Sequence, residues 1–164
     1  MTAIADFITR FGPSHAPRVA FAWNGKHGAD LRDSNLEFRR AVVKEVLAQL
    51  EAAPPELLHA LVDAETALAA EAWGTNLWVH TLAEQMLIRG GASMVPDFLR
   101  FRTRGMDAHC ELSRVSLPRG VAAEYEAFCV GRLAATDVPG EAKLFMEGVR
   151  FFRSVAELAQ RQSG

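Results

Sequence analysis

The chain has 164 residues, a length typical of one domain with a single core. Its composition, 49% apolar and 23% charged, is that of a folded protein and excludes an intrinsically disordered chain. The net charge of −2 gives no general attraction to nucleic acid, and no run approaches the roughly 20 apolar residues of a membrane span, so we expect a cytoplasmic protein that binds no membrane.

The N-terminal part of the chain contains the only strand-like pattern. Residues 18–23 alternate in polarity and precede Asn24-Gly25, a turn pair that favours a short N-terminal hairpin. The rest of residues 12–33 is rich in Gly, Pro, His and Asp, which predicts an irregular loop segment. A helix is predicted over residues 35–50, where Ser34 and Glu37 have the spacing of a capping box.

Helical periodicity continues to the C-terminus. Further helices are predicted over residues 55–73, 76–89, 93–104, 107–114, 119–135 and 139–160. Pro55 suits the first turn of a helix, the 76–89 helix is apolar enough for the middle of a bundle, and the amphipathic 139–160 helix should close the core. The sequence therefore predicts an all-α fold, a single helical domain over residues 1–164 built as a bundle of about six to eight helices.

Glu65 falls in the middle of the apolar stripe of the 55–73 helix, among leucines and alanines. A carboxylate there loses hydration, so it must find a hydrogen-bond donor or remain protonated. Glu65 is therefore a buried polar candidate with two interpretations. Either it is structural, paired with a buried arginine, tryptophan indole or backbone amide or lying slightly off the apolar stripe, or it belongs to a functional site.

Ligand-type side chains recur on the opposite face of the same helix. Glu56, His59 and Asp63 are spaced i, i+3 and i+7, and His80 and Glu84 in the next helix are spaced i, i+4. Glu-x-x-His is half of the ligand pattern of di-metal helical bundles, and it occurs here in one copy. These five residues make a candidate site for a divalent metal; the alternative is a solvated acidic face with no cofactor.

The charges are divided along the chain. Residues 51–88 hold six acidic residues and no Lys or Arg, whereas residues 89–119 hold six arginines and three acids. The acidic segment suits a basic protein partner, and its candidate partner-binding residues are Glu56, Asp63, Glu71 and Glu84. The alternative is that the arginines pair with the acidic segment inside the chain.

Other chemistries lack their sequence signatures. Cys110 and Cys129 match no metal-ligand spacing and no catalytic-cysteine pattern, so we expect both to fill the core or its edge. The sequence contains no nucleophile elbow and no phosphate-binding glycine motif. Arg100, Arg102 and Arg104 are two positions apart and should fan around a helix axis, so we do not expect them to bind nucleic acid as one strip.

Residues 54–106 carry a recognisable series of motifs: Pro54-Pro55-Glu56, Trp73 and Trp78, Gly90-Gly91-Ala92-Ser93, and Phe98-Leu99-Arg100-Phe101-Arg102 before Gly105. The series resembles a family of small bacterial all-helical proteins that is defined as a domain of unknown function. Met94 and Val95 depart from the family pattern, which has acids after the serine, and the pattern's aromatic residue beyond the Phe-Arg pair is missing. The resemblance implies an all-helical bacterial domain and transfers no catalytic residue.

The leading hypothesis is a non-enzymatic protein-binding protein, in particular an immunity-type inhibitor of a basic bacterial toxin. The alternative is a helical bundle that binds a metal or small ligand, with a metal-dependent enzyme as its catalytic form. A third hypothesis is a homodimer formed through the apolar 76–89 helix.

Overall fold

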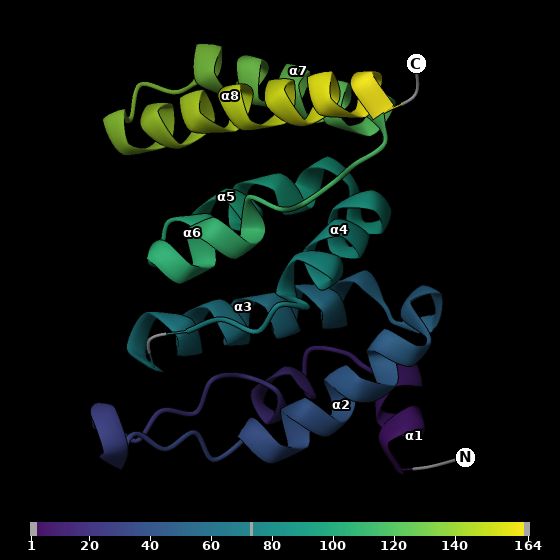
Figure 1. Ribbon diagram of the computed structural model, residues 1–164, viewed down its shortest axis with the longest axis vertical. Helices are drawn as coiled ribbons and strands as arrows, with labels where there is room; N and C mark the ends of the chain where they lie inside the picture. Colours follow the sequence, from purple (N-terminus) through teal and green to yellow (C-terminus); the bar gives the residue numbers. More distant parts are fainter. Residues whose placement is uncertain (1–2, 73, 163–164) are drawn as a thin grey trace.

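The computed structural model describes residues 3–72 and 74–162 and arranges them as a stack of helical layers (Figure 1). Helices α1 (Ala3–Thr9) and α2 (Leu36–Ala48) form one end, next to α3 (Pro55–Ala72). The middle contains α4 (Val79–Gly90), α5 (Val95–Arg102) and α6 (Met106–Leu112). The antiparallel pair α7 (Arg119–Ala135) and α8 (Pro139–Gln162) forms the other end. The predicted all-helical bundle is confirmed.

The starts of α2 and α3 test two of the helix-start signals predicted from the sequence. Helix α3 begins at Pro55 as predicted, and Trp73, the predicted end of this helix, lies outside the described residues. At the start of α2, the predicted capping box between Ser34 and Glu37 is wrong, because the helix has no side-chain cap there. Instead, Asp33 Oδ1 accepts the amide of Asn35 at 3.1 Å, so the acidic residue one position earlier stabilises this turn.

The predicted hairpin is replaced by a loop. Within the described residues the strand-like segment forms only an isolated antiparallel bridge between Trp23 and Asp33. The side chain of Asn24 bonds backbone amides that would otherwise be free for a β-ladder. Its Oδ1 accepts the amide N–H of Lys26 at 3.2 Å and that of Arg32 at 3.0 Å. The structure also adds α1, whose seven residues are shorter than the windows of about 11–18 residues in which periodicity is visible.

Helix α4 occupies the middle of the core, as predicted. Its apolar face is buried within the chain through Val79, Leu82, Ala83, Met86 and Leu87. Tyr125 of α7 donates its hydroxyl to the carbonyl of Leu87 at 2.6 Å, which ties the last helical layer to α4. This face of α4 is covered within the chain, whereas Leu77 and Ile88 of the predicted 76–89 helix are exposed, and the homodimer stays a prediction.

Helix α8 closes the core over α5 and α7. Phe145, Phe152 and Val155 are buried along it, and Gly148 lets its backbone approach Leu99 and Cys129 closely. Along the described part of the chain, no helix combines the length and the apolarity that a membrane span needs.

Candidate interaction site: a loop anchored by a buried ion triad

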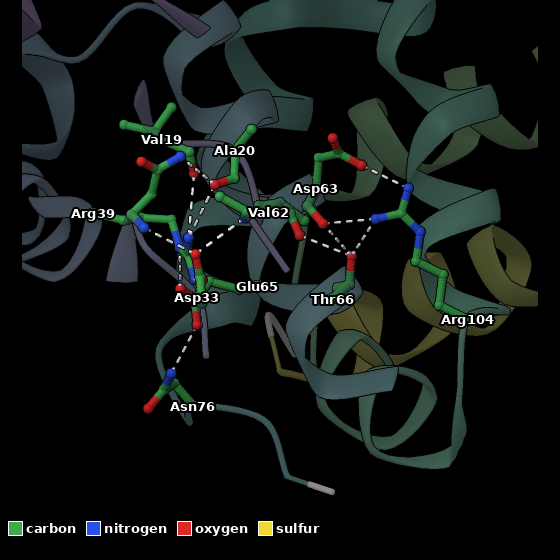
Figure 2. Close-up of polar contacts among 12 residues, drawn as sticks. Val19, Ala20, Asp33, Arg39, Val62, Asp63, Glu65, Thr66, Asn76 and Arg104 are labelled. Carbon is green, nitrogen blue, oxygen red and sulfur yellow. Dashed lines mark hydrogen bonds and ion pairs between the residues drawn. The ribbon is translucent and has the colours of Figure 1, made fainter. Parts of the chain in front are cut away.

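The N-terminal loop is anchored by Asp33, Arg39 and Glu65, which we call the ion triad (Figure 2). Arg39 of α2 is 0% exposed, and its Nε donates to Glu65 Oε1 at 2.7 Å. Its Nη2 donates to Asp33 Oδ2 at 2.6 Å, and Nη1 lies 3.4 Å from the carbonyls of Val19 and Ala20. The guanidinium is therefore held between α3 and two parts of the N-terminal segment.

Both carboxylates of the ion triad have further donors. Glu65 Oε2 accepts from Asn76 Nδ2 at 2.8 Å, and Asp33 Oδ1 accepts the amide of Ala22 at 3.0 Å as well as that of Asn35. Such complete hydrogen bonding is what allows charged groups to be buried. Glu65 thus pairs with a buried arginine, the first interpretation offered by the sequence. Arg39 itself was missed, although its spacing to Val42, Val43 and Val46 places it on the buried face of α2.

The segment that the triad anchors, residues 20–35, is named here the pinned loop. Besides the bonds of Asn24 to Lys26 and Arg32, the Asn24 side chain donates to Asp30 O at 2.9 Å. Asn35 Nδ2 donates to the carbonyls of Pro17 and Ala20 at 2.8 and 2.9 Å. The pinned loop thus has a defined conformation with little regular secondary structure.

The tip of the pinned loop remains at the surface. Trp23 is 38% exposed, stacks on Phe21 with ring centroids 6.3 Å apart, and donates its indole N–H to Lys26 O at 2.7 Å. His27 packs edge-on against Trp23, and its Nδ1 lies 3.3 Å from Glu71 Oε2 on α3. A hollow of about 370 Å³ lies between this part of the loop and the end of α3. The tip therefore combines an aromatic ring, cationic side chains and the carboxylates of Asp30 and Glu71.

Asp63, on another face of α3, pairs with the arginine-rich segment (Figure 2). Arg104 Nη2 lies 2.6 Å from Asp63 Oδ1, and its Nη1 donates to the Asp63 carbonyl at 2.6 Å and to Thr66 Oγ1 at 3.0 Å. For this pair, the structure shows the alternative offered by the sequence, in which the two charge segments pair inside the chain. The predicted fan of arginines is also confirmed: Arg100 pairs with Asp97 at the surface, whereas Arg102 is buried over Phe151.

The other proposed partner-binding acids do not form one free surface with Asp63. Glu84 Oε1 accepts the amide of Ser116 at 2.8 Å, and Glu71 lies beside His27. Glu56 is exposed at the start of α3. Of these residues, Glu71 is the one that lies at the tip of the pinned loop.

The candidate metal ligands are also separated. His59 Nε2 lies 3.0 Å from Asp97 Oδ2, and His80 Nδ1 lies 2.6 Å from Glu111 Oε1. Burial would raise the pKa of Asp97, but hydrogen bonds from His59 and Arg100 outweigh it and lower that pKa. Residues 3–72 and 74–162 contain no group of three or more His, Cys, Asp or Glu side chains placed to hold a metal ion.

The two cysteines differ in their surroundings. Cys129 is buried between α7 and α8, as expected, but Cys110 is exposed on α6. The prediction that both would fill the core or its edge is therefore wrong for Cys110. Helix α6 buries Ala108, Glu111 and Leu112, and Cys110 lies between these positions on the outer side.

No protein family, no curated protein and no solved structure matches the chain. The resemblance over residues 54–106 therefore rests on the sequence motifs alone.

Proposed function

We propose that this chain is a non-enzymatic protein-binding protein and that the tip of the pinned loop, with Glu71, is its recognition surface. The observation that supports this is the contrast within the loop: Asp33 at its base has a side chain that is 0% exposed, while Trp23 at its tip is 38% exposed. A loop fixed before binding loses less conformational entropy when a partner binds, which favours affinity and specificity.

The energetics of the ion triad support the same proposal. Burying three charged groups removes them from water, so such a cluster contributes little net stability compared with apolar residues of the same volume. Its effect here is to hold one loop conformation against α2 and α3. Trp and Arg side chains, which contribute strongly to many protein interfaces, are present at the tip as Trp23 and Arg32.

The finer form of the proposal is an immunity-type inhibitor of a basic bacterial toxin. The acids of the 51–88 segment that remain at the surface support it, since acidic surfaces accelerate association with basic partners. Glu71 brings one of these charges to the tip of the pinned loop, and Glu56 is exposed elsewhere on α3.

The experiment is affinity capture from the cells that naturally produce the protein, using three tagged forms. The first is unaltered, the second carries Trp23→Ala with Glu71→Lys, and the third carries Met146→Ala with Glu157→Lys. The third form is a matched control, because it changes one exposed apolar and one acidic side chain on α8. Circular dichroism and thermal unfolding first establish that all three forms are folded.

A protein held stoichiometrically by the unaltered form and the α8 variant, but lost from the loop variant, is the expected result. Retention of that protein by the loop variant would show that recognition lies elsewhere. If the unaltered form holds no protein at physiological salt, the protein-binding proposal fails.

A further inference from the structure

Arg102, near the end of α5, is a buried cation with an incomplete set of partners. It is 8% exposed, and its guanidinium carbon lies 4.1 Å from the centre of the Phe151 ring of α8. Nη2 donates to Ser113 Oγ at 3.1 Å, whereas the buried Nε has no hydrogen-bond partner among the described residues. Within residues 3–72 and 74–162, no carboxylate oxygen lies within 4.0 Å of this guanidinium.

The comparison with Arg39 shows how unusual this arrangement is within the chain. Arg39 has two carboxylates at 2.6 and 2.7 Å, which compensate the loss of hydration on burial. Arg102 has a hydroxyl and an aromatic face instead. Burial lowers the pKa of Arg102, and the more distant charge of Glu147 opposes this effect. A guanidinium in this setting gains from any anion that reaches it.

The surface beside Arg102 is hollowed. A hollow of about 330 Å³ is lined by Arg102, His109, Glu147, Arg150 and Phe151. Its lining has two arginines and one glutamate, and His109 adds ring nitrogens that can donate. Ser113 and Phe151, the two contacts of Arg102, also line an adjoining hollow of about 390 Å³ that includes Val155 and Leu158. The cationic site therefore lies next to a hollow of mixed lining, with apolar side chains on part of its wall.

We propose that the hollow beside Arg102 binds the oxyanion group of a small molecule, a carboxylate or a phosphate. Arg102 is its principal ligand, because a guanidinium can donate two parallel N–H bonds to either group. Stacking on Phe151 and the bond to Ser113 fix the plane of this guanidinium before binding. Arg150, exposed at the edge of the hollow, adds a second positive charge. The adjoining hollow would accommodate an apolar part of the ligand.

The test is an NMR titration of nitrogen-labelled protein with inorganic phosphate and, separately, with acetate, at constant ionic strength. We expect a saturable shift of the Arg102 Nε–H signal and of the Ser113 and Phe151 amides. Saturation by phosphate alone identifies a phosphate site, saturation by acetate alone identifies a carboxylate site, and saturation by both identifies a general oxyanion site. Each of these results supports the proposal.

Three variants localise the binding. Arg102→Met should weaken it by about tenfold or more, read from the Ser113 and Phe151 amides, and Arg150→Met should weaken it by about threefold. Arg153→Met is the matched control on α8, since Arg153 pairs with Glu126 and does not line the hollow; it should leave the affinity unchanged. If Arg102→Met does not fold, Arg150→Met and Ser113→Ala test the same site.

Two results would overturn the proposal. One is shifts that stay linear up to about 100 mM of both anions, which indicates only general ionic effects. The other is equal affinity in the control and in the variants of the hollow, which places the anion elsewhere on the protein.

Discussion

Arg39 and Glu65 form an ion pair between α2 and α3 with Nε and Oε1 2.7 Å apart and side chains only 0% and 2% exposed. Neither charge can be rehydrated in place if the other is removed. We expect Glu65→Ala to lower the free energy of unfolding by about 3–5 kcal/mol, because it leaves the buried Arg39 with one carboxylate and leaves a cavity. Urea unfolding followed by circular dichroism measures this change.

The exposed pair of Arg153 and Glu126 provides the control for this prediction. Its partners are 59% and 24% exposed, so Glu126→Ala should cost less than about 1 kcal/mol. If the two alanine variants lose similar stability, the ion triad does not have the energetic role argued from its burial.

The pinned loop should lose its order when Asp33 is altered. Asp33→Asn keeps the size of the side chain but removes the charge that faces Arg39 Nη2 at 2.6 Å. Hydrogen exchange should then accelerate by about tenfold or more at the amides of Ala22, Ser34 and Asn35, because the local opening free energy falls by more than about 1.4 kcal/mol. Amides of α8 serve as the internal reference. Uniform acceleration in both regions would mean a global loss of stability and no specific anchoring of the loop.

Gly148 should not tolerate a side chain. A Cβ at this position would lie 2.7 Å from Leu99 Cδ1 and 2.8 Å from Cys129 Sγ, so Gly148→Ala forces α8 away from its neighbours. We expect a loss of about 1–3 kcal/mol in the free energy of unfolding. Gly131 of α7 is the matched control, since a Cβ there meets nothing within 4 Å. Gly131→Ala should stabilise the protein by about 0.5–1 kcal/mol through helix propensity. Thermal unfolding of both variants tests whether the two substitutions change the stability in opposite directions.

The sequence anticipated the features that depend on local pattern. Pro55 marked the start of α3, and the apolar neighbours of Glu65 showed that its carboxylate needed a partner. The partner, Arg39, is 26 residues away along the chain, and a long cationic side chain on a helix is usually placed at the surface. Which residue pairs with Glu65 therefore depends on how α2 packs on α3. The conformation of the pinned loop could not be predicted either. Alternating polarity suggests a β-ladder, but the side-chain hydrogen bonds of Asn24 and Asp33 take the place of that ladder.

The pKa of Asp97 gives a pH dependence with a definite sign. That pKa lies below its ordinary value of 3.8, so the native state favours the ionised carboxylate. The resulting stabilisation is present above the pKa of the unfolded state and is lost as pH falls through the lower native pKa. Asp97 is 43% exposed, so Asp97→Asn should cost less than about 1 kcal/mol at pH 7. The difference from the unaltered protein should shrink as the pH falls below 3.8. A difference that is independent of pH would show that the carboxylate charge is not its cause.

The two cysteines should differ sharply in reactivity. Burial raises the pKa of the Cys129 thiol to about 12, with a smaller contribution from the charge of Glu126, so almost no thiolate forms at neutral pH. Cys110 is exposed on α6 and can be reached by reagents in solution. A chromogenic disulfide reagent should therefore titrate one thiol in the native protein and both after unfolding in guanidinium chloride. Cys110→Ser should abolish the native reaction and leave one thiol after unfolding. Rapid modification of Cys129 in folded Cys110→Ser protein would show that α7 and α8 open readily, contrary to the close packing at Gly148.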